Sequence, residues 1–318
     1  MPIPQRTIGR TGLSATILGL GGGGNSRLGL STGQSEAHAA DVVRAALDLG
    51  VTLFDTARVY GTECAVGQAL RGRRREQVVL SSKSPYLDEE GNLLTAQAFA
   101  ENIDTSLQEL GVKMIDIYFI HGLQLPQYAA ARERFLPVLE QARQAGKIRF
   151  TGVTEAFERD TRHEMLQRAV LDGEWDVFMV GFNLLNQSAR ERVLAVTRQT
   201  GAGTLGMFAV RRGLIDESRL RTLLGRLAEE GEIDPALAQA PDLMERLGLR
   251  GVSETLSEAA YRFASYEPGM DCVLSGTSSA EHLQENLASV QRGPLPERTI
   301  EHLRRLFGRI DSISAQVR

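Results

Sequence analysis

The sequence predicts an α/β fold: a closed (β/α)8 TIM barrel of parallel strands, with an N-terminal β-hairpin before it and a C-terminal helix after it. Eight short, mostly apolar segments alternate with amphipathic segments along the 318 residues. The apolar segments lack the polar alternation of a half-exposed sheet, which is typical of parallel strands covered on both faces. Two half-size doubly wound units remain an alternative arrangement of the same segments.

The expected elements follow one another in a regular order. Gly9-Arg10-Thr11-Gly12 suits the turn of a hairpin within 6–16. The expected strands are Ile17–Leu20, Val51–Phe54, Val78–Leu80, Ile115–Ile120, Ile148–Val153, Val177–Phe182, Gly203–Phe208 and Cys272–Leu274. Helical periodicity predicts helices over 36–49, 96–110, 136–145, 162–171, 189–200 and 257–264, and a final packing helix over 296–307.

We expect one domain, 1–318, with an insertion. The stretch 213–254 departs from the strand–helix alternation, because it holds charged helical pieces, two prolines and several glycines. A long departure of this kind is typical of a lid on the functional face of a barrel. The insertion and residues 122–134 are therefore expected to shape a substrate pocket.

Composition and charge argue against several classes of protein. The chain is 42% hydrophobic and 24% charged, with a net charge of −4, whereas binding to nucleic acid favours a basic surface. No apolar run approaches the roughly 20 residues of a membrane-spanning helix, so we expect neither a nucleic-acid nor a membrane partner. The N-terminus lacks a secretion signal and two cysteines are too few for a disulfide scaffold, which predicts a cytoplasmic protein.

The glycine run 19–24 contains the G-x-G-x-x-G spacing of dinucleotide-binding turns. In that fold the glycines open directly into a helix, and an acidic residue follows after about 20 residues. Here a further glycine-broken stretch comes first, and Asp55 lies much further on. We therefore interpret the run as a loop leaving the first barrel strand, where Gly21, Gly22 and Gly23 let the backbone approach a ligand closely.

Four polar residues follow three consecutive expected strands. The strand in GVTLFDTARVYG (50–61) ends in Asp55, and Tyr60 lies on the following loop. The next two strands continue into Lys83 and His121. Catalytic residues of such barrels lie at the carboxyl ends of strands, so we expect one site. Taken singly, each residue also has a structural interpretation, such as a buried ion pair or a core histidine.

This set of residues, in this order, resembles the aldo-keto reductase family from about Arg6 to Arg292. FDTARVYGTECAVGQAL is similar to the family's Asp-Tyr signature, including the downstream Glu63 and Gly67. GKIRFTGVT, FNLLNQSA and GTSSAEHLQENL are similar to its fifth, sixth and eighth strand regions.

The resemblance implies roles for the four polar residues. Tyr60 would give its phenolic proton to a carbonyl oxygen as hydride arrives from a nicotinamide, or accept it in the reverse direction. A tyrosine with a pKa of about 10 ionises too rarely to serve both directions at neutral pH. Lys83 would favour the tyrosinate, Asp55 would hold Lys83, and His121 would orient the carbonyl and assist proton transfer.

The resemblance also implies a nicotinamide cofactor, NADP(H) or NAD(H), and a set of residues around it. These residues are Gly21, Gly22, Gly23, Asp55, Thr154, Glu155, Met179, Met207, Phe208, Arg211, Arg212, Gly276, Thr277, Ser278, His282, Glu285 and Asn286. Several depart from the family pattern. Thr154–Glu155 replaces a Ser-Asn pair, Met179 replaces a glutamine, and ring stacking on the nicotinamide would fall to Met207 or Phe208.

The choice of nucleotide depends on the eighth strand region. Members that prefer NADP often present a lysine and an arginine to the 2′-phosphate, and Gly276 and His282 occupy those positions here. Losing two charge-assisted partners favours NAD or dual use. Thr277, Ser278 and the neighbouring helix N-terminus would still offer some contacts to a phosphate.

The sequence therefore predicts an oxidoreductase that moves a hydride between NAD(P)H and a small-molecule carbonyl or alcohol, such as an aldehyde, a ketone or a sugar-type compound. The alternative is a nucleotide-binding regulatory barrel protein with little turnover, which the departures at Thr154–Glu155, Met179 and Met207 motivate. A metal-dependent barrel hydrolase lacks support, because no His-x-His pair occurs at the strand ends.

Overall fold

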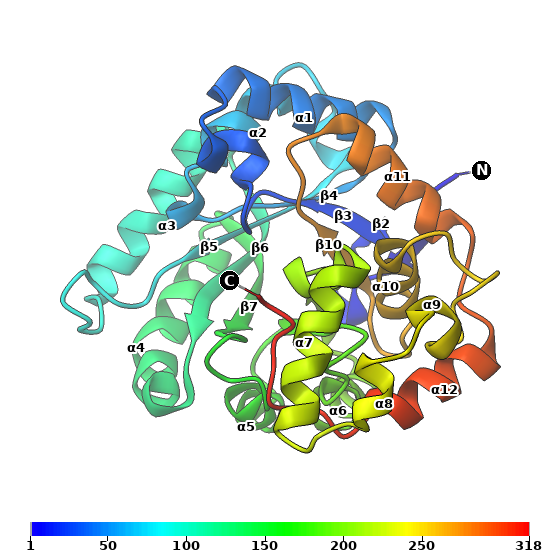
Figure 1. Cartoon of the computed structure of the whole chain (residues 1–318). Coiled ribbons are helices and arrows are strands. Elements are labelled where there is room, and N and C mark those ends of the chain that lie inside the picture. Colours follow the sequence, from blue (N-terminus) through cyan, green and yellow to red (C-terminus); the bar gives the residue numbers. More distant parts are fainter. Residues whose placement is uncertain (1, 318) are drawn as a thin grey trace.

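A closed barrel of parallel strands forms the centre of the molecule (Figure 1). The computed structural model describes residues 2–317. Neighbouring strands pair in the order β10-β3-β4-β5-β6-β7-β8-β9, and each pairing is parallel. The predicted (β/α)8 barrel is thereby confirmed, and the alternative of two doubly wound units is wrong.

Each predicted strand is present, and the differences lie at the ends. The strands are β3 (Leu18–Gly21), β4 (Leu53–Asp55), β5 (Val79–Ser84), β6 (Ile115–Leu123), β7 (Ile148–Glu155), β8 (Val177–Gly181), β9 (Gly203–Met207) and β10 (Cys272–Ser275). Several extend further in the carboxyl direction than their apolar runs, because the polar residues that follow are also buried. Ser81–Ser84 of β5 is the clearest case.

The predicted N-terminal hairpin closes one end of the barrel. Strands β1 (Gln5–Thr7) and β2 (Ser14–Thr16) pair antiparallel. Ile8 in the turn is fully buried and packs with apolar side chains from the barrel interior. The backbone N–H of Gly9 donates to Asp271 Oδ2 at 2.9 Å, which ties the turn to the start of β10. The hairpin therefore occupies the end of the barrel that lies opposite the carboxyl ends of the strands.

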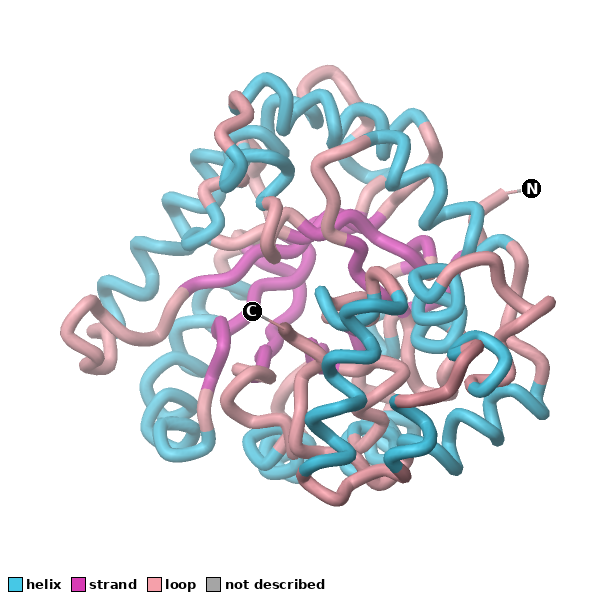
Figure 2. The backbone as a smooth tube through the Cα atoms, viewed as in Figure 1, coloured by secondary structure: helices cyan, strands magenta, loops and turns pink. Residues whose placement is uncertain are grey.

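Helices surround the barrel (Figure 2). They are α1 (Glu36–Asp48), α2 (Glu63–Leu70), α3 (Ala96–Leu110), α4 (Leu125–Gln144), α5 (Glu164–Asp172), α6 (Ala195–Thr200), α10 (Leu256–Ser265) and α11 (Ala280–Gln291). The predicted start of α4 at 136 is wrong. Tyr128 and Ala131 extend its buried face towards the N-terminus, so residues 125–134 belong to the helix.

The insertion 213–254 is a packed helical layer. It contains α7 (Glu217–Glu229), α8 (Pro235–Ala238) and α9 (Leu243–Arg246). The buried leucines of α7 share one apolar cluster with the barrel helices. After α12 (Glu297–Phe307), the predicted final helix, the chain returns beside α7 (Figure 1), and Ala315 O accepts a hydrogen bond from Gly213 N at 3.1 Å. No helix within residues 2–317 is long and apolar enough to cross a membrane.

Candidate active site

The structure brings the four predicted side chains together at the carboxyl ends of β4, β5 and β6. Asp55 ends β4, Lys83 and His121 lie in β5 and β6, and Tyr60 lies in the turn after β4. Tyr60 OH and His121 Nε2 are 3.2 Å apart. Lys83 Nζ lies 4.9 Å from the centre of the Tyr60 ring.

Lys83 and Asp55 form a buried ion pair. The ammonium donates to the two carboxylate oxygens at 2.8 and 2.6 Å and to the carbonyl of Thr56 at 2.8 Å, while Ser81 Oγ donates to Asp55 Oδ1 at 2.6 Å. Burial alone would lower the pKa of Lys83, but Asp55 and Tyr60 raise it overall. The ammonium therefore stays charged beneath the phenol.

The protonation states of Tyr60 and His121 follow from their surroundings. Burial raises the pKa of Tyr60, and the Lys83 ammonium opposes this increase. The phenol thus carries its proton at neutral pH and is able to give it away. Burial, with a smaller contribution from Lys83, lowers the pKa of His121 to about 3, so its imidazole is neutral. A neutral imidazole suits an orienting hydrogen bond better than acid catalysis.

The glycine run beside β3 gives Tyr60 its position. A Cβ at Gly23 would lie 2.5 Å from the Tyr60 ring, so a larger residue would displace the phenol. Gly22 N donates to the carbonyl of Asp55 at 2.6 Å, and Thr62 Oγ1 donates to the carbonyl of Gly22 at 3.3 Å. The run therefore packs against the catalytic candidates, which the sequence interpretation did not anticipate.

A cavity of about 600 Å³ opens beside Tyr60. Most of the predicted cofactor residues line it: Gly21, Gly23, Asp55, Met179, Met207, Phe208, Arg211, Arg212, Gly276, Thr277, Ser278, His282, Glu285 and Asn286. Sequence reasoning missed Asn25 and Ser26 after the glycines, and Thr255 and Ser257 at the start of α10. The T-x-x-E pattern from Thr255 is a helix-start signal that would have placed these last two.

Three predicted residues lie outside the lining that the described residues form. Gly22 packs against Thr62, and Thr154 Oγ1 accepts a hydrogen bond from Gly122 N at 2.7 Å. Glu155 is buried and its carboxylate oxygens contact His163 Nδ1 at 2.9 and 3.0 Å. Burial raises the pKa of Glu155, and His163 opposes this increase.

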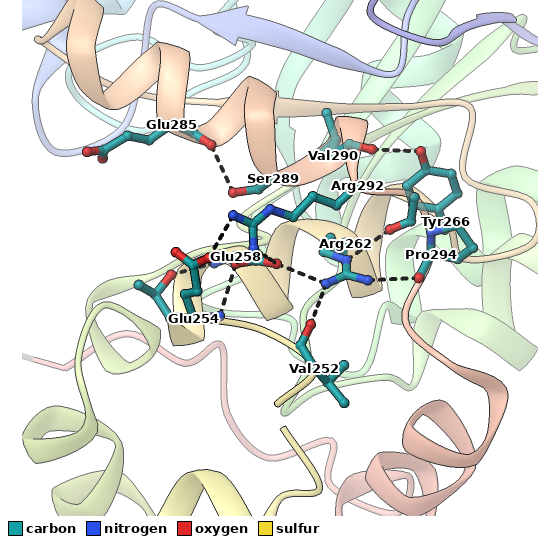
Figure 3. A network of polar contacts seen from close by, with 12 residues as sticks. Val252, Glu254, Glu258, Arg262, Tyr266, Glu285, Ser289, Val290, Arg292 and Pro294 are labelled. Carbon is teal, nitrogen blue, oxygen red and sulfur yellow. Dashed lines mark hydrogen bonds and ion pairs between the residues drawn. The ribbon is translucent and has the colours of Figure 1, made fainter. Parts of the chain in front are cut away.

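A polar network built on the buried Arg262–Glu258 pair supports the wall of the cavity that Glu285 lines (Figure 3). Arg262 donates to Glu258 at 2.9 Å and to the backbone carbonyls of Val252, Gly293 and Pro294 at 2.7 to 3.0 Å. Arg292 pairs with Glu258 and with Glu254. These contacts join α10 to the segment that directly follows α11. Figure 3 shows the Glu285 carboxylate pointing away from both arginines.

A model of the aldo/keto reductase family matches residues 17–307. The chain belongs to this family. It is 26% identical over 306 residues to the NADH-specific methylglyoxal reductase of Escherichia coli strain K12, covering 89% of this chain and 90% of that protein. It is 28% identical over 297 residues to L-galactose dehydrogenase of Arabidopsis thaliana, covering 91% and 88%.

Solved structures show the same fold. The holo form of aldo-keto reductase AKR11C1 from Bacillus halodurans superposes with a TM-score of 0.74 at 23% identity, covering 98% of each chain. The family reduces carbonyl groups with NAD(P)H, and this chain is an oxidoreductase of that family. Within residues 2–317, no group of three or more histidine, cysteine or acidic side chains is arranged to hold a metal ion.

Proposed function

We propose that this protein reduces a small-molecule carbonyl with NAD(P)H, using Tyr60 as the proton donor. The observation that carries the proposal is the position of Tyr60, which lines the cavity while Lys83 and His121 lie beside it. A single tyrosine is ordinary, but one placed beside a satisfied Lys–Asp pair and a neutral imidazole at a cavity is suited to proton transfer.

The size and the lining of the cavity support a nicotinamide dinucleotide as its ligand. Its volume of about 600 Å³ is in the range of cofactor sites. Ser278 lines it next to the N-terminus of α11, where Ser279 caps the helix, and Arg211 offers a buried guanidinium nitrogen without a partner among the described residues. Both features suit the phosphates of a nucleotide. The bound cofactor would supply the hydride.

Side chains of the protein carry out the proton transfer. Tyr60 OH donates its proton to the carbonyl oxygen, and Lys83 stabilises the phenolate that remains. Asp55 keeps the Lys83 ammonium in place through two hydrogen bonds. His121, being neutral, orients the carbonyl oxygen beside Tyr60. In the oxidative direction the phenolate takes the proton back from an alcohol.

The contact to the nicotinamide ring falls to Met207 in this proposal. The Arg211 guanidinium lies 3.9 Å above the centre of the Phe208 ring, so that face of Phe208 is already covered. Met179 and Met207 both line the cavity and offer flexible apolar surface. Thr154 and Glu155 would contribute indirectly, because their side chains bond within the protein.

We also propose that NADH is the preferred nucleotide. Gly276 and the exposed His282 stand where a 2′-phosphate would need cations, and Arg292, which follows the C-terminus of α11, is paired with two carboxylates. The Escherichia coli relative is named as NADH-specific. Michaelis constants for both nucleotides test this, and a tenfold or larger preference for NADPH would contradict the charge argument.

The Tyr60→Phe variant tests the main proposal. Removing the phenolic proton should lower kcat about 100-fold or more with each active carbonyl, while the Kd for NADH stays unchanged. A panel containing methylglyoxal, simple aldehydes and ketones, and sugars would supply the substrates. Full turnover by Tyr60→Phe would refute the role of Tyr60. Tight nucleotide binding by the wild type without turnover on any substrate would favour the regulatory alternative.

A further inference from the structure

Four flat side chains form a stacked column that begins at the cavity and ends in the protein interior. Arg211 lies over the Phe208 ring at 3.9 Å. The Phe208 and Phe157 rings are 6.2 Å apart at an interplanar angle of 14°, and Phe157 and His163 are 5.2 Å apart at 14°. We call Arg211, Phe208, Phe157 and His163 the stacked column.

The interior end of the stacked column is fixed by Glu155. This carboxylate contacts His163 Nδ1 at 2.9 and 3.0 Å and also accepts a hydrogen bond from Gly181 N at 2.7 Å. A Cβ at Gly181 would lie 2.3 Å from the Phe157 ring, so glycine is needed for that ring to fit. The acid therefore holds the imidazole while the backbone of β8 holds Phe157.

Two members of the stacked column have an unusual backbone. His163 has φ 60° and Phe208 has φ 67°, in the left-handed region that residues with a side chain rarely adopt. Such conformations persist where the surroundings determine them, and they are concentrated at functional sites. The column is thus maintained against a local backbone preference at both residues.

At the cavity end of the stacked column, one nitrogen of the Arg211 guanidinium lacks a hydrogen-bond partner among the described residues. Arg211 is only 7% exposed; its Nε donates to Gln316 Oε1 at 2.9 Å and its Nη2 bonds to Glu158. Its Nη1 is buried without a hydrogen-bond partner among the described residues, although the side chain lines the cavity. A buried, unsatisfied guanidinium nitrogen is costly unless a ligand supplies an acceptor.

We propose that Glu155, His163 and Phe157 are positioning residues, which hold Arg211 so that its Nη1 meets the diphosphate of the bound nucleotide. The inference rests on the proposed function, since it takes the cavity to be the nucleotide site. A planar guanidinium whose orientation is fixed by stacking binds phosphate oxygens with little loss of conformational freedom. Glu155 then acts on the cofactor through the stacked column and not by contact.

A double-mutant cycle tests whether Phe157 acts through Arg211. The Kd for NADH is measured by fluorescence titration for the wild type, Phe157→Leu, Arg211→Met and the double variant. We expect Phe157→Leu to raise the Kd about 3- to 10-fold and Arg211→Met to raise it about 10-fold or more. The double variant should match Arg211→Met alone, because the effect of Phe157 passes through the missing guanidinium.

The control is a second aromatic stack away from the cavity. Phe263→Leu breaks the stacked rings of Phe182 and Phe263, neither of which lines the cavity. It should lower the thermal unfolding midpoint as Phe157→Leu does but leave the Kd unchanged. If Phe157→Leu fails to fold, Phe157→Met replaces it in the cycle, because methionine fills a similar space without a flat ring to stack on Phe208.

Two results would overturn the positioning role. One is a Kd for Phe157→Leu within twofold of the wild type. The other is a double variant whose Kd shows the product of the two single effects, as independent structural damage would give. Failure of the proposed function gives a different result. The wild type would then bind NADH but reduce no carbonyl, and the Kd values of the double-mutant cycle would still be measurable. A wild type that binds neither NADH nor NADPH would overturn both.

Discussion

Two arginines in this barrel lie over phenylalanine rings that belong to stacked pairs, and only one of them has a partner for each guanidinium nitrogen among the described residues. Arg190 lies 5.7 Å from the Phe182 ring and 5.9 Å from Phe263. It donates to Glu267 at 2.5 and 2.7 Å and to Gln187 at 2.9 Å. Arg211, over Phe208, keeps Nη1 unbonded beside the cavity. The same combination of side chains thus supports the fold in one place and leaves a binding group open in the other.

The largest expected effect comes from breaking the closed stack. Arg190→Met removes the bidentate partner of Glu267, which is 4% exposed. The buried Glu267 carboxylate would then lose both hydrogen bonds from Arg190, which should lower the free energy of unfolding by about 3 kcal/mol. Arg304, 3.9 Å from Glu267, limits the loss. Urea denaturation measures it, and an unchanged midpoint would show that the Arg190 stack does not support the fold.

The matching change at the open stack should have the opposite profile. Arg211→Met removes a buried group that lacks one partner, so the free energy of unfolding should change by less than about 1 kcal/mol. The Kd for NADH should nevertheless rise about 10-fold or more, because charge-assisted hydrogen bonds contribute about 1.5–3 kcal/mol. The test is to measure the free energy of unfolding and the Kd for NADH for both Arg190→Met and Arg211→Met. Equal loss of stability from Arg190→Met and Arg211→Met would remove the distinction between the stacks.

His121 makes the stability of the protein depend on pH. Its pKa in the folded protein is about 3, below the ordinary value of 6.5, because it is buried neutral. The unfolded chain therefore binds a proton at a pH where the folded chain does not, so the free energy of unfolding falls as the pH decreases from about 6.5 towards 3. Above about 6.5 this contribution is complete.

Urea denaturation of the wild type and of His121→Gln at several pH values between 7.5 and 4.5 measures the contribution of His121. The wild type should lose stability more steeply than His121→Gln as the pH falls. His282→Gln serves as the control, because His282 is exposed, and its curve should parallel the wild type. Parallel curves for the wild type and His121→Gln would show that His121 is readily protonated in the folded state.

The sequence was sufficient to predict the barrel because its signals are local. Apolar runs separated by helical periodicity place each strand, and a glycine or capping residue at several boundaries limits the error to a few residues. The carboxyl end of β5 was missed for a physical reason. Ser81–Ser84 is polar but fully buried, since Ser81 and Lys83 bond to Asp55, and a buried polar strand does not differ from a loop by composition.

The stacked column could not be predicted in the same way. Glu155 and His163 are separated by a loop, and His163 adopts φ 60°, a conformation that the residue pattern does not predict. The departure at Glu155 from the family pattern was visible, but its side chain was expected to face the cofactor. The structure shows it bonded to His163 and Gly181 instead. Polar pairs inside a core become recognisable only when the packing around them is known.

The smallest expected effect concerns the C-terminal tail, which supplies one of the groups that hold Arg211. Gln316 Oε1 accepts a hydrogen bond from Arg211 Nε at 2.9 Å. Gln316→Ala should raise the Kd for NADH about threefold, since one hydrogen bond contributes roughly 0.5–1.5 kcal/mol. Because Phe208 and Glu158 still hold the guanidinium, the loss must be smaller than that of Phe157→Leu. A larger loss would mean that the tail, and not the stacked column, positions Arg211.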